Sequence, residues 1–233
     1  KARTGEAKGV LVLSSSEIYG NPSPENVPTP ETYLGNVSCI GPRACYDESK
    51  RAAETLAWIY YNYHDVPVKT VRPFNVYGPG QRLDDARIIP DLIGALISGE
   101  PLTLYSNGKA TRAFCYVAGA ATAIFSVLTD PNTAGEIYNV GNDETEITIS
   151  DLADLALNVG RELLENCESV VKFGKSDDVA YTTHSPVRRC PNLTKIRESI
   201  GYQPQITLHE GLSRTLQSYA TTEQISLKLT PDD

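Results

Sequence analysis

The chain has 233 residues, of which 40% are apolar and 21% charged, and this is enough to bury one large core or two small ones. Its net charge is −8 and its lysines and arginines are scattered, so we expect no nucleic-acid partner and no membrane partner. The sequence shows no apolar run of membrane-spanning length and no signal peptide, and its five cysteines have no CxxC spacing. We therefore expect a cytoplasmic protein with reduced thiols and no metal site.

Strand-like and helix-like segments alternate along the chain, which predicts an α/β fold with a mainly parallel sheet. Apolar runs predict strands at residues 10–13, 66–71, 102–105, 137–140 and 170–173. Helical spacing predicts helices at residues 43–64, 88–97, 151–164, 193–200 and 209–219, and an alanine-rich helix that ends at Leu128. Ser150 is the predicted N-cap of the helix at residues 151–164. We expect a proline-rich loop over the site at residues 21–42, a polar loop at residues 174–191 and a loose tail over the last dozen residues.

Polar residues follow the first two predicted strands directly. Ser14, Ser15, Ser16 and Glu17 come after residues 10–13, and the turn-forming segment 72–80 comes after residues 66–71. Open α/β sheets bind their ligands at the carboxyl ends of parallel strands. We therefore expect the functional site at this edge of the sheet.

Tyr46 and Lys50 are the candidate reactive pair. They are four residues apart on the predicted helix at residues 43–64, so they share one face of it. A lysine ammonium there favours the tyrosinate electrostatically, and such a tyrosine can act as a base near neutral pH. The spacing predicts a proton-transfer pair, and because the motif is short, other segments have to support it.

Three motifs occur in a fixed order: Ser-Ser-Ser-Glu-Ile-Tyr-Gly at residues 14–20, Tyr-x-x-x-Lys at residues 46–50 and Arg-Pro-Phe-Asn-Val-Tyr-Gly-Pro at residues 72–79. Together they resemble the extended short-chain dehydrogenase/reductase family that modifies nucleotide sugars, over about residues 8–219. Within that family, residues 33–51 and the Thr-Arg-Ala-Phe segment at residues 111–114 look most like UDP-glucuronate decarboxylases. The resemblance implies a Rossmann-like doubly wound parallel sheet with a smaller C-terminal α/β substrate-binding domain.

The resemblance also implies roles for single residues. Tyr46 would take the proton from the sugar 4-hydroxyl while hydride leaves C4 for the cofactor NAD, and Lys50 would hold the nicotinamide ribose. Ser15 would hydrogen-bond the same hydroxyl, and Glu17 with its neighbour Ser16 would act near C5 and C6. The remaining implied positions are Ser14 and Pro73 for the cofactor, and Asn75, Arg82, Tyr105 and Arg112 for a UDP- or dTDP-sugar substrate. Arg188 or Arg189 would be a further contact to its phosphates.

The implied reaction is decarboxylation of UDP-glucuronate to a UDP-pentose. Oxidising C4 of a glucuronate gives a 4-keto acid that loses CO2 readily, because the electrons left behind spread into the ketone. The enzyme then needs only to protonate C5 and return the hydride to C4, which restores NAD. Ser16 stands where 4,6-dehydratases usually have Asp, and a serine is no useful acid, so the Ser-Glu pair favours a decarboxylase. A 4-epimerase or 4,6-dehydratase acting on another UDP- or dTDP-sugar stays open, as does a non-catalytic relative that binds NAD or a nucleotide sugar.

The resemblance places the glycine-rich dinucleotide loop before residue 1. The chain contains no Met and begins with a short polar segment that leads directly into a strand, so we expect an N-terminal portion to precede it. The residue that chooses between NAD and NADP would lie there. We expect residues 1–80 and 113–141 in the NAD-binding domain, residues 81–112 and 142–220 in the nucleotide-sugar-binding domain, and residues 221–233 as a tail. The resemblance also implies a homodimer through the helix at residues 43–64.

Overall fold

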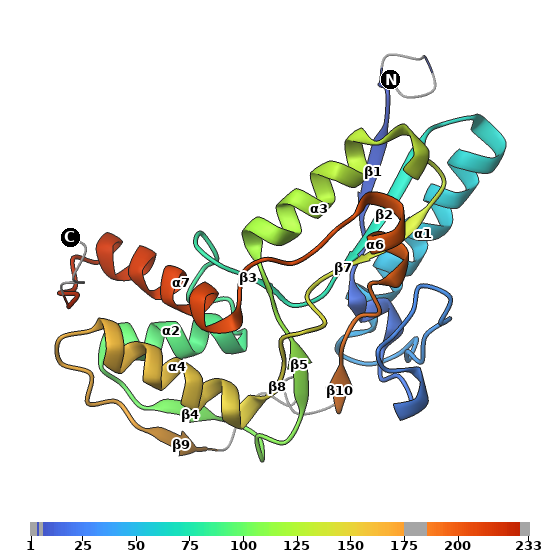
Figure 1. The fold of residues 1–233 in the computed structure, drawn as a ribbon. Coiled ribbons are helices and arrows are strands. Elements are labelled where there is room, and N and C mark those ends of the chain that lie inside the picture. The colour runs from blue at the N-terminus through green and yellow to red at the C-terminus, as the bar shows by residue number, and fades with distance from the viewer. Residues whose placement is uncertain (1–3, 5–6, 175–185, 229–233) are drawn as a thin grey trace. The chain divides into compact units, whose positions relative to one another are not determined.

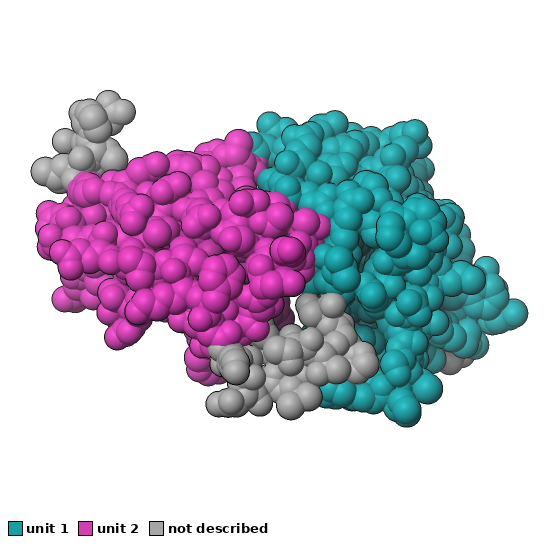
Figure 2. Space-filling view, turned by 90° about the horizontal axis from the view of Figure 1, so that it is seen from below, with its two compact units in different colours: residues 1–76, 112–146, 183–205 teal, residues 77–111, 147–182, 206–233 magenta. Residues whose placement is uncertain are grey.

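The computed structural model describes residue 4, residues 7–174 and residues 186–228 of the chain. The chain forms two compact units, and each is built from three segments that are separate in the sequence. Unit 1 comprises residues 1–76, 112–146 and 183–205, and unit 2 comprises residues 77–111, 147–182 and 206–233 (Figure 2).

The centre of unit 1 is a three-stranded parallel sheet with strand order β1-β2-β7 (Figure 1). Its strands are β1 (Val10–Leu13), β2 (Val68–Pro73) and β7 (Ile137–Val140). All but the last residue of β2 are buried, as expected of a central parallel strand with both faces covered. The parallel sheet confirms the predicted fold class, and the three strands lie within two residues of the apolar runs that predicted them.

Helices cover both faces of this sheet. They are α1 (Ala44–His64), α3 (Val117–Thr129) and α6 (Thr194–Ile200). Val68 and Val71 are three residues apart on β2 and therefore point to opposite faces. Val68 packs in one apolar cluster with Ala57 of α1, and Val71 packs in another with Ala123 of α3 and Ile196 of α6. This arrangement makes the sheet of unit 1 doubly wound.

Unit 1 also contains short elements that lie outside this sheet. They are the 3-10 helices η2 (Ser16–Tyr19), η3 (Pro24–Asn26) and η4 (Pro131–Thr133), and the strands β6 (Cys115–Tyr116) and β10 (Arg188–Arg189). Gly20 ends η2 with φ 62° and ψ −126°, a backbone region that favours glycine, and forms an isolated bridge with Asn36. The segment between Gly20 and Asn36 is therefore a loop that returns to the end of η2.

In the residues of unit 2 that the structure describes, helices pack together beside one pair of parallel strands. Its elements are α2 (Ile88–Ser98), β4 (Leu102–Leu104), α4 (Ile149–Leu163), β9 (Val171–Phe173) and α7 (Leu208–Thr222). β4 pairs with β9, and the three helices contact one another. Fully buried side chains from four of these elements form the core, among them Leu92, Ile93, Leu102, Leu152, Leu212 and Leu216.

Three of the five points at which the chain passes from one unit to the other lie in short strands. These strands are β3 (Val76–Tyr77), β5 (Thr111–Ala113) and β8 (Glu146–Thr148). β3 pairs with β6, and β5 is the middle strand of a small sheet with order β10-β5-β8. None of the helices in the described part of the chain has the length and apolar character that crossing a membrane requires.

Four expectations about local structure and domain boundaries need correction. The N-cap of α4 is Thr148, whose Oγ1 accepts a hydrogen bond from the Asp151 N–H at 3.0 Å, while Ser150 lies inside the first turn. The tail is not loose as far as residue 228, because Leu227 forms a bridge with Leu164 and the N–H of Lys228 donates to the Leu163 carbonyl.

The other two corrections concern residues 174–205. Within the expected polar loop, residues 188–189 form strand β10, while residues 175–185 lie outside the described part of the chain. Residues 186–205 belong to unit 1 and not to the expected nucleotide-sugar-binding domain, because Leu193, Ile196 and Tyr202 pack into the α3 side of the sheet.

Candidate active site

Tyr46 and Lys50 lie on the first turns of α1, next to the carboxyl end of β1. The Lys50 ammonium donates a hydrogen bond to the backbone carbonyl of Leu13, the last residue of β1, at 2.8 Å. The same nitrogen is 5.6 Å from the centroid of the Tyr46 ring. Tyr46 is 45% exposed. The structure thus brings the predicted proton-transfer pair together at the predicted edge of the sheet.

Three serines, Ser14 to Ser16, directly follow β1 in the sequence. All three are buried, and the Ser14 Oγ has no hydrogen-bond partner in the described part of the chain. Ser15 is the N-cap of η2, and its Oγ accepts a hydrogen bond from the Glu17 N–H at 3.2 Å. Ser16 is 3% exposed and begins η2. This local capping explains why a short polar run directly after a strand turns into a 3-10 helix.

Glu17 is held between two arginines. Its Oε2 lies 2.6 Å from a guanidinium nitrogen of Arg43, and both of its oxygens pair with Arg189, one of them at 2.9 Å. Burial alone would raise the pKa of Glu17, but the charges and hydrogen bonds of Arg189 and Arg43 lower it from 4.5 to about 2. Glu17 is therefore a carboxylate at neutral pH and does not carry a proton that it could donate.

Asp47 lies close to this group of charges, and the sequence did not mark it. It follows Tyr46 directly, is 8% exposed, and its Oδ1 has no hydrogen-bond partner among the described residues. Burial, and then the negative charge of Glu17, raise the pKa of Asp47 above its usual value. Arg43 and Asp47 are four residues apart, so the i, i+4 spacing at the start of the helix was the signal that could have identified them.

The segment after β2 carries two predicted residues. Pro73 is the last residue of β2 and lies at the carboxyl edge of the sheet. Asn75 has a positive φ of 39°, and its Nδ2 donates to the Ala113 carbonyl at 2.8 Å. The Asn75 carbonyl accepts from the N–H of Cys115 at 3.2 Å. Asn75 therefore fixes the turn after β2 to the segment of β5 and β6.

The predicted arginines differ in their surroundings. Arg112 is buried on β5. Arg188 forms a bidentate ion pair with Glu146, with distances of 2.6 and 2.8 Å, and also donates to the Val27 carbonyl. Arg189 pairs with Glu17, as described above. The two neighbouring arginines that were candidate phosphate contacts are thus each paired with a carboxylate of unit 1 in this structure.

Two predicted residues, Arg82 and Tyr105, belong to unit 2. Arg82 is highly exposed and forms a bidentate pair with Asp84, at 2.8 and 2.6 Å. Tyr105 follows β4 and is 39% exposed. Their proposed contacts with a substrate stay predictions.

A buried polar network surrounds Arg72 of β2, and no motif in the sequence predicted it. The Arg72 guanidinium forms a bidentate pair with Glu54 of α1, at 2.9 and 2.6 Å, and donates to the Tyr19 hydroxyl at 2.7 Å and the Glu31 carbonyl at 2.9 Å. The Tyr19 hydroxyl in turn donates to the Asn139 Oδ1 at 2.8 Å. A buried guanidinium without partners would cost several kcal/mol, so this set of partners is what permits a charge inside the sheet layer. Partners so far apart in the sequence leave no local signal.

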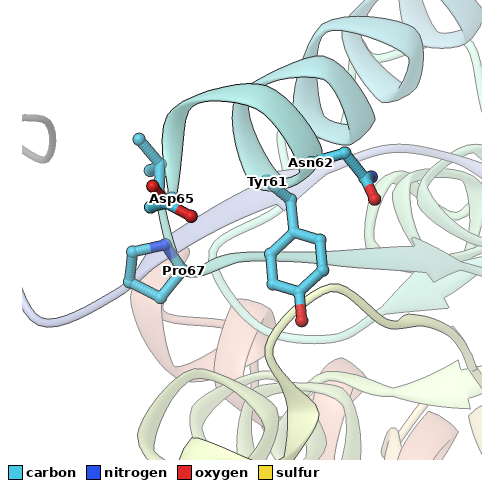
Figure 3. Close-up of a pocket in the computed structure, with 5 residues that line it drawn as sticks. Tyr61, Asn62, Asp65 and Pro67 are labelled. Carbon is cyan, nitrogen blue, oxygen red and sulfur yellow. The ribbon is translucent and has the colours of Figure 1, made fainter.

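A surface hollow of about 380 Å³ lies at the other end of α1 (Figure 3). Tyr61 and Asn62 project from the last turns of the helix beside Asp65 and Pro67, and Val66 completes the lining. At 1.5 Å per residue, Tyr61 lies about 22 Å from Tyr46 along the helix axis. The hollow is next to the amino end of β2, whereas parallel sheets bind ligands at their carboxyl ends. We therefore assign it no part in the chemistry.

A doubly wound parallel sheet with a tyrosine–lysine helix at its carboxyl edge defines a Rossmann-like α/β protein. The sequence of residues 2–141 matches the NAD dependent epimerase/dehydratase family, so the chain belongs to this family. The match covers the sheet of unit 1, Ser14 to Glu17, and the Tyr46–Lys50 helix.

Similar proteins agree with this assignment. The chain is 38% identical over 203 residues to UDP-glucuronic acid decarboxylase 5 of Arabidopsis thaliana, which covers 87% of the chain and 55% of that protein. It is 36% identical over 211 residues to UDP-glucuronic acid decarboxylase 1 of Danio rerio, covering 91% of the chain and 47% of that protein. The chain thus spans about half the length of the relatives it matches. Among solved structures, an epimerase from Methanothermobacter thermautotrophicus has the same fold, with a TM-score of 0.81 at 20% identity, covering 96% of this chain and 62% of the other.

Proposed function

We propose that the full-length protein is an NAD-dependent decarboxylase of UDP-glucuronate that forms a UDP-pentose. The observation that carries the proposal is the placement of Tyr46 and Lys50 at the carboxyl end of β1, with the Lys50 ammonium anchored on the Leu13 carbonyl. Similarity to UDP-glucuronic acid decarboxylases over most of the chain supports this choice of substrate and reaction.

The residues at this edge fit the nicotinamide end of NAD. The Ser14 Oγ is a buried hydroxyl without a partner in the described part of the chain, which suits a polar group of a bound cofactor. Ser14, Pro73, Tyr46 and Lys50 are the residues that would hold NAD, with the Lys50 ammonium donating to the ribose. When bound, NAD would supply the hydride acceptor for the transient oxidation of C4.

The protein's own groups then handle protons and charge. Tyr46 takes the proton of the sugar 4-hydroxyl, and the Ser15 hydroxyl, already oriented by the Glu17 N–H, donates to the same oxygen. The positive charges of Arg43 and Arg189 favour the negative charge of a sugar acid near Glu17. Ser16, Asn75, Arg82, Tyr105, Arg112 and Arg188 stay proposed substrate contacts.

The test is to incubate the full-length protein with UDP-glucuronate and NAD and to measure CO2 and UDP-pentose. We expect both products, and we expect Tyr46→Phe to lower the rate at least about 100-fold because the base is lost. Tyr61→Phe is the matched control, since Tyr61 lies on the same helix, is 40% exposed and lines the hollow to which we assign no part in the chemistry. If wild-type protein forms neither CO2 nor a pentose, the decarboxylase proposal is wrong.

The second candidate is a 4-epimerase or 4,6-dehydratase acting on a UDP- or dTDP-sugar. Ser15, Tyr46 and Lys50 serve the oxidation of C4 in all of these reactions, so these residues alone do not separate them. Product analysis with UDP-glucose and dTDP-glucose tests this alternative, because an epimerase or dehydratase would convert them without release of CO2. A non-catalytic binding protein, the third candidate, would tolerate Tyr46→Phe without loss of function in the cell.

We further propose a cytoplasmic homodimer that pairs through α1. Exposed aromatic side chains on this helix support the pairing: Trp58 is 55% exposed and Tyr63 is 69% exposed, and their rings meet edge to face at 5.6 Å. A monomer in sedimentation of the full-length protein at micromolar concentration would contradict the dimer. Cell fractionation tests the location.

A further inference from the structure

Arg72 is bonded to both segments that carry the proposed chemistry. One of its partners, Glu54, lies on α1 one helical turn after Lys50. Another, Tyr19, ends η2, the short helix that begins directly after Ser15. The Arg72 guanidinium also lies over the Tyr19 ring, 4.9 Å from its centroid. The tyrosine is therefore fixed by a hydrogen bond and by a cation–π contact at once.

The bond to Glu54 fixes α1 against the sheet. Tyr46, Lys50 and Glu54 follow at intervals of four residues and so point to nearly the same side of the helix. Lys50 anchors this side on the end of β1, and Glu54 anchors it on Arg72 of β2. The two anchoring residues are one turn apart on α1, and they bind to neighbouring strands. Together they fix the rotation of α1 about its axis and its position along that axis, and so they fix where Tyr46 lies.

The bond to Tyr19 fixes the other segment. Because the Tyr19 hydroxyl accepts from Arg72 and donates to Asn139 of β7, it has one orientation only. The Asn139 Nδ2 donates hydrogen bonds to the carbonyls of Thr29 and Asn192, at 2.9 and 3.2 Å, so the Asn139 side chain is itself held in place. Burial raises the pKa of Tyr19 despite the neighbouring Arg72, so the hydroxyl remains a donor at physiological pH. The position of η2, and with it the Ser15 hydroxyl, therefore depends on β2 and β7.

We propose that Arg72 is a positioning residue, which sets the distance between the Tyr46–Lys50 pair on α1 and the Ser15 hydroxyl before η2. It acts through Glu54 and Tyr19, and it does not touch the substrate. The proposal rests on the proposed function, in which Tyr46 and Ser15 act on the same sugar oxygen. A displacement of about 1 Å between two such groups is enough to slow a reaction about 100-fold.

The experiment compares Arg72→Lys with Arg197→Lys in the full-length protein. Arg197 forms an equally bidentate pair with Asp143 in unit 1, at 2.7 and 2.7 Å, and neither residue has a role in the proposed chemistry. A lysine keeps the charge in both variants but cannot hold two partners in a fixed fork. If Arg72→Lys does not fold, Glu54→Gln is the second variant. It is milder, because glutamine keeps the size of the glutamate side chain and one of its two acceptor oxygens.

Two readouts separate positioning from stability. Rates are measured at the same number of degrees below the Tm of each variant. We expect Arg72→Lys to lower kcat at least about tenfold while KM changes less than about threefold. We expect Arg197→Lys to leave kcat unchanged. We also expect hydrogen exchange at residues 14–19 and 44–50 to rise about tenfold in Arg72→Lys only.

The inference is overturned if the two arginine variants lose kcat equally or if exchange in the two segments does not respond to Arg72→Lys. The exchange readout needs no turnover. If the wild-type protein converts no nucleotide sugar, the proposed function fails, and the exchange pattern still decides whether Arg72 positions the two segments.

Discussion

Replacing Glu17 with glutamine tests the most highly charged part of the site. Glu17→Gln keeps the size of the side chain and removes the negative charge between Arg43 and Arg189. The pKa of Glu17 falls from 4.5 to about 2 in the folded protein, and a shift of that size corresponds to about 3 kcal/mol of stability. We expect Glu17→Gln to lower the free energy of unfolding at pH 7 by about that amount.

The loss should depend on pH in a defined direction. Because the folded pKa lies below the unfolded one, the ionised Glu17 contributes its full stability above about pH 4.5. This contribution is lost as the pH falls from 4.5 towards 2, where the carboxyl becomes protonated in both states. The difference between the wild type and Glu17→Gln should therefore be constant from pH 7 to pH 5 and should shrink below that.

Urea titrations of both proteins at several pH values between 7 and 2.5 measure this difference. Glu136→Gln is the matched control, because Glu136 pairs with Lys195 in unit 1 at 2.7 Å, but both side chains are more than a third exposed. An exposed pair of this kind contributes less than about 1 kcal/mol, so the control should remain close to the wild type at every pH. If Glu17→Gln and Glu136→Gln are equally stable at pH 7, the two arginines do not stabilise Glu17 as argued.

Three further outcomes are expected. Tyr46→Phe should lower turnover at least about 100-fold while the Tm stays within about 2 °C, since the side chain is half exposed; kinetics and calorimetry check this. Gly20→Ala should destabilise unit 1 by more than about 2 kcal/mol in urea titrations, because its φ is 62° and a Cβ there would collide with the backbone oxygen of Asn36. Thr148→Ala should cost about 1 kcal/mol through the lost N-cap of α4, and Thr148→Ser should restore it, as thermal unfolding would show.

The sequence predicted the framework of the site because that framework is local. A short apolar run ending in serines marks both the buried strand β1 and its carboxyl end, and the i, i+4 spacing of Tyr46 and Lys50 marks a shared helix face. The N-cap of α4 was misplaced by two residues because several hydroxyl side chains lie close together before the helix, and backbone angles decide which of them caps it.

What escaped prediction depends on partners far apart in the chain. Arg189 looked like a phosphate ligand, but its carboxylate partner Glu17 is 172 residues away. Arg72 looked like part of a turn motif, but Glu54 and Tyr19 make it the centre of a buried network. A buried arginine needs hydrogen-bond and ion-pair partners, and only the folded chain shows which residues these are.

The division of each unit into separate segments has a consequence for biosynthesis. The core of unit 1 includes Leu193, Ile196 and Tyr202, which are translated long after the sheet against which they pack. When β7 has been synthesised but Leu193 has not, the strands β1, β2 and β7 are all present. The α3 side of their sheet still lacks these apolar side chains at that stage. A nascent chain that stalls before residue 193 therefore exposes apolar surface, which makes it a substrate for chaperones and a source of aggregation.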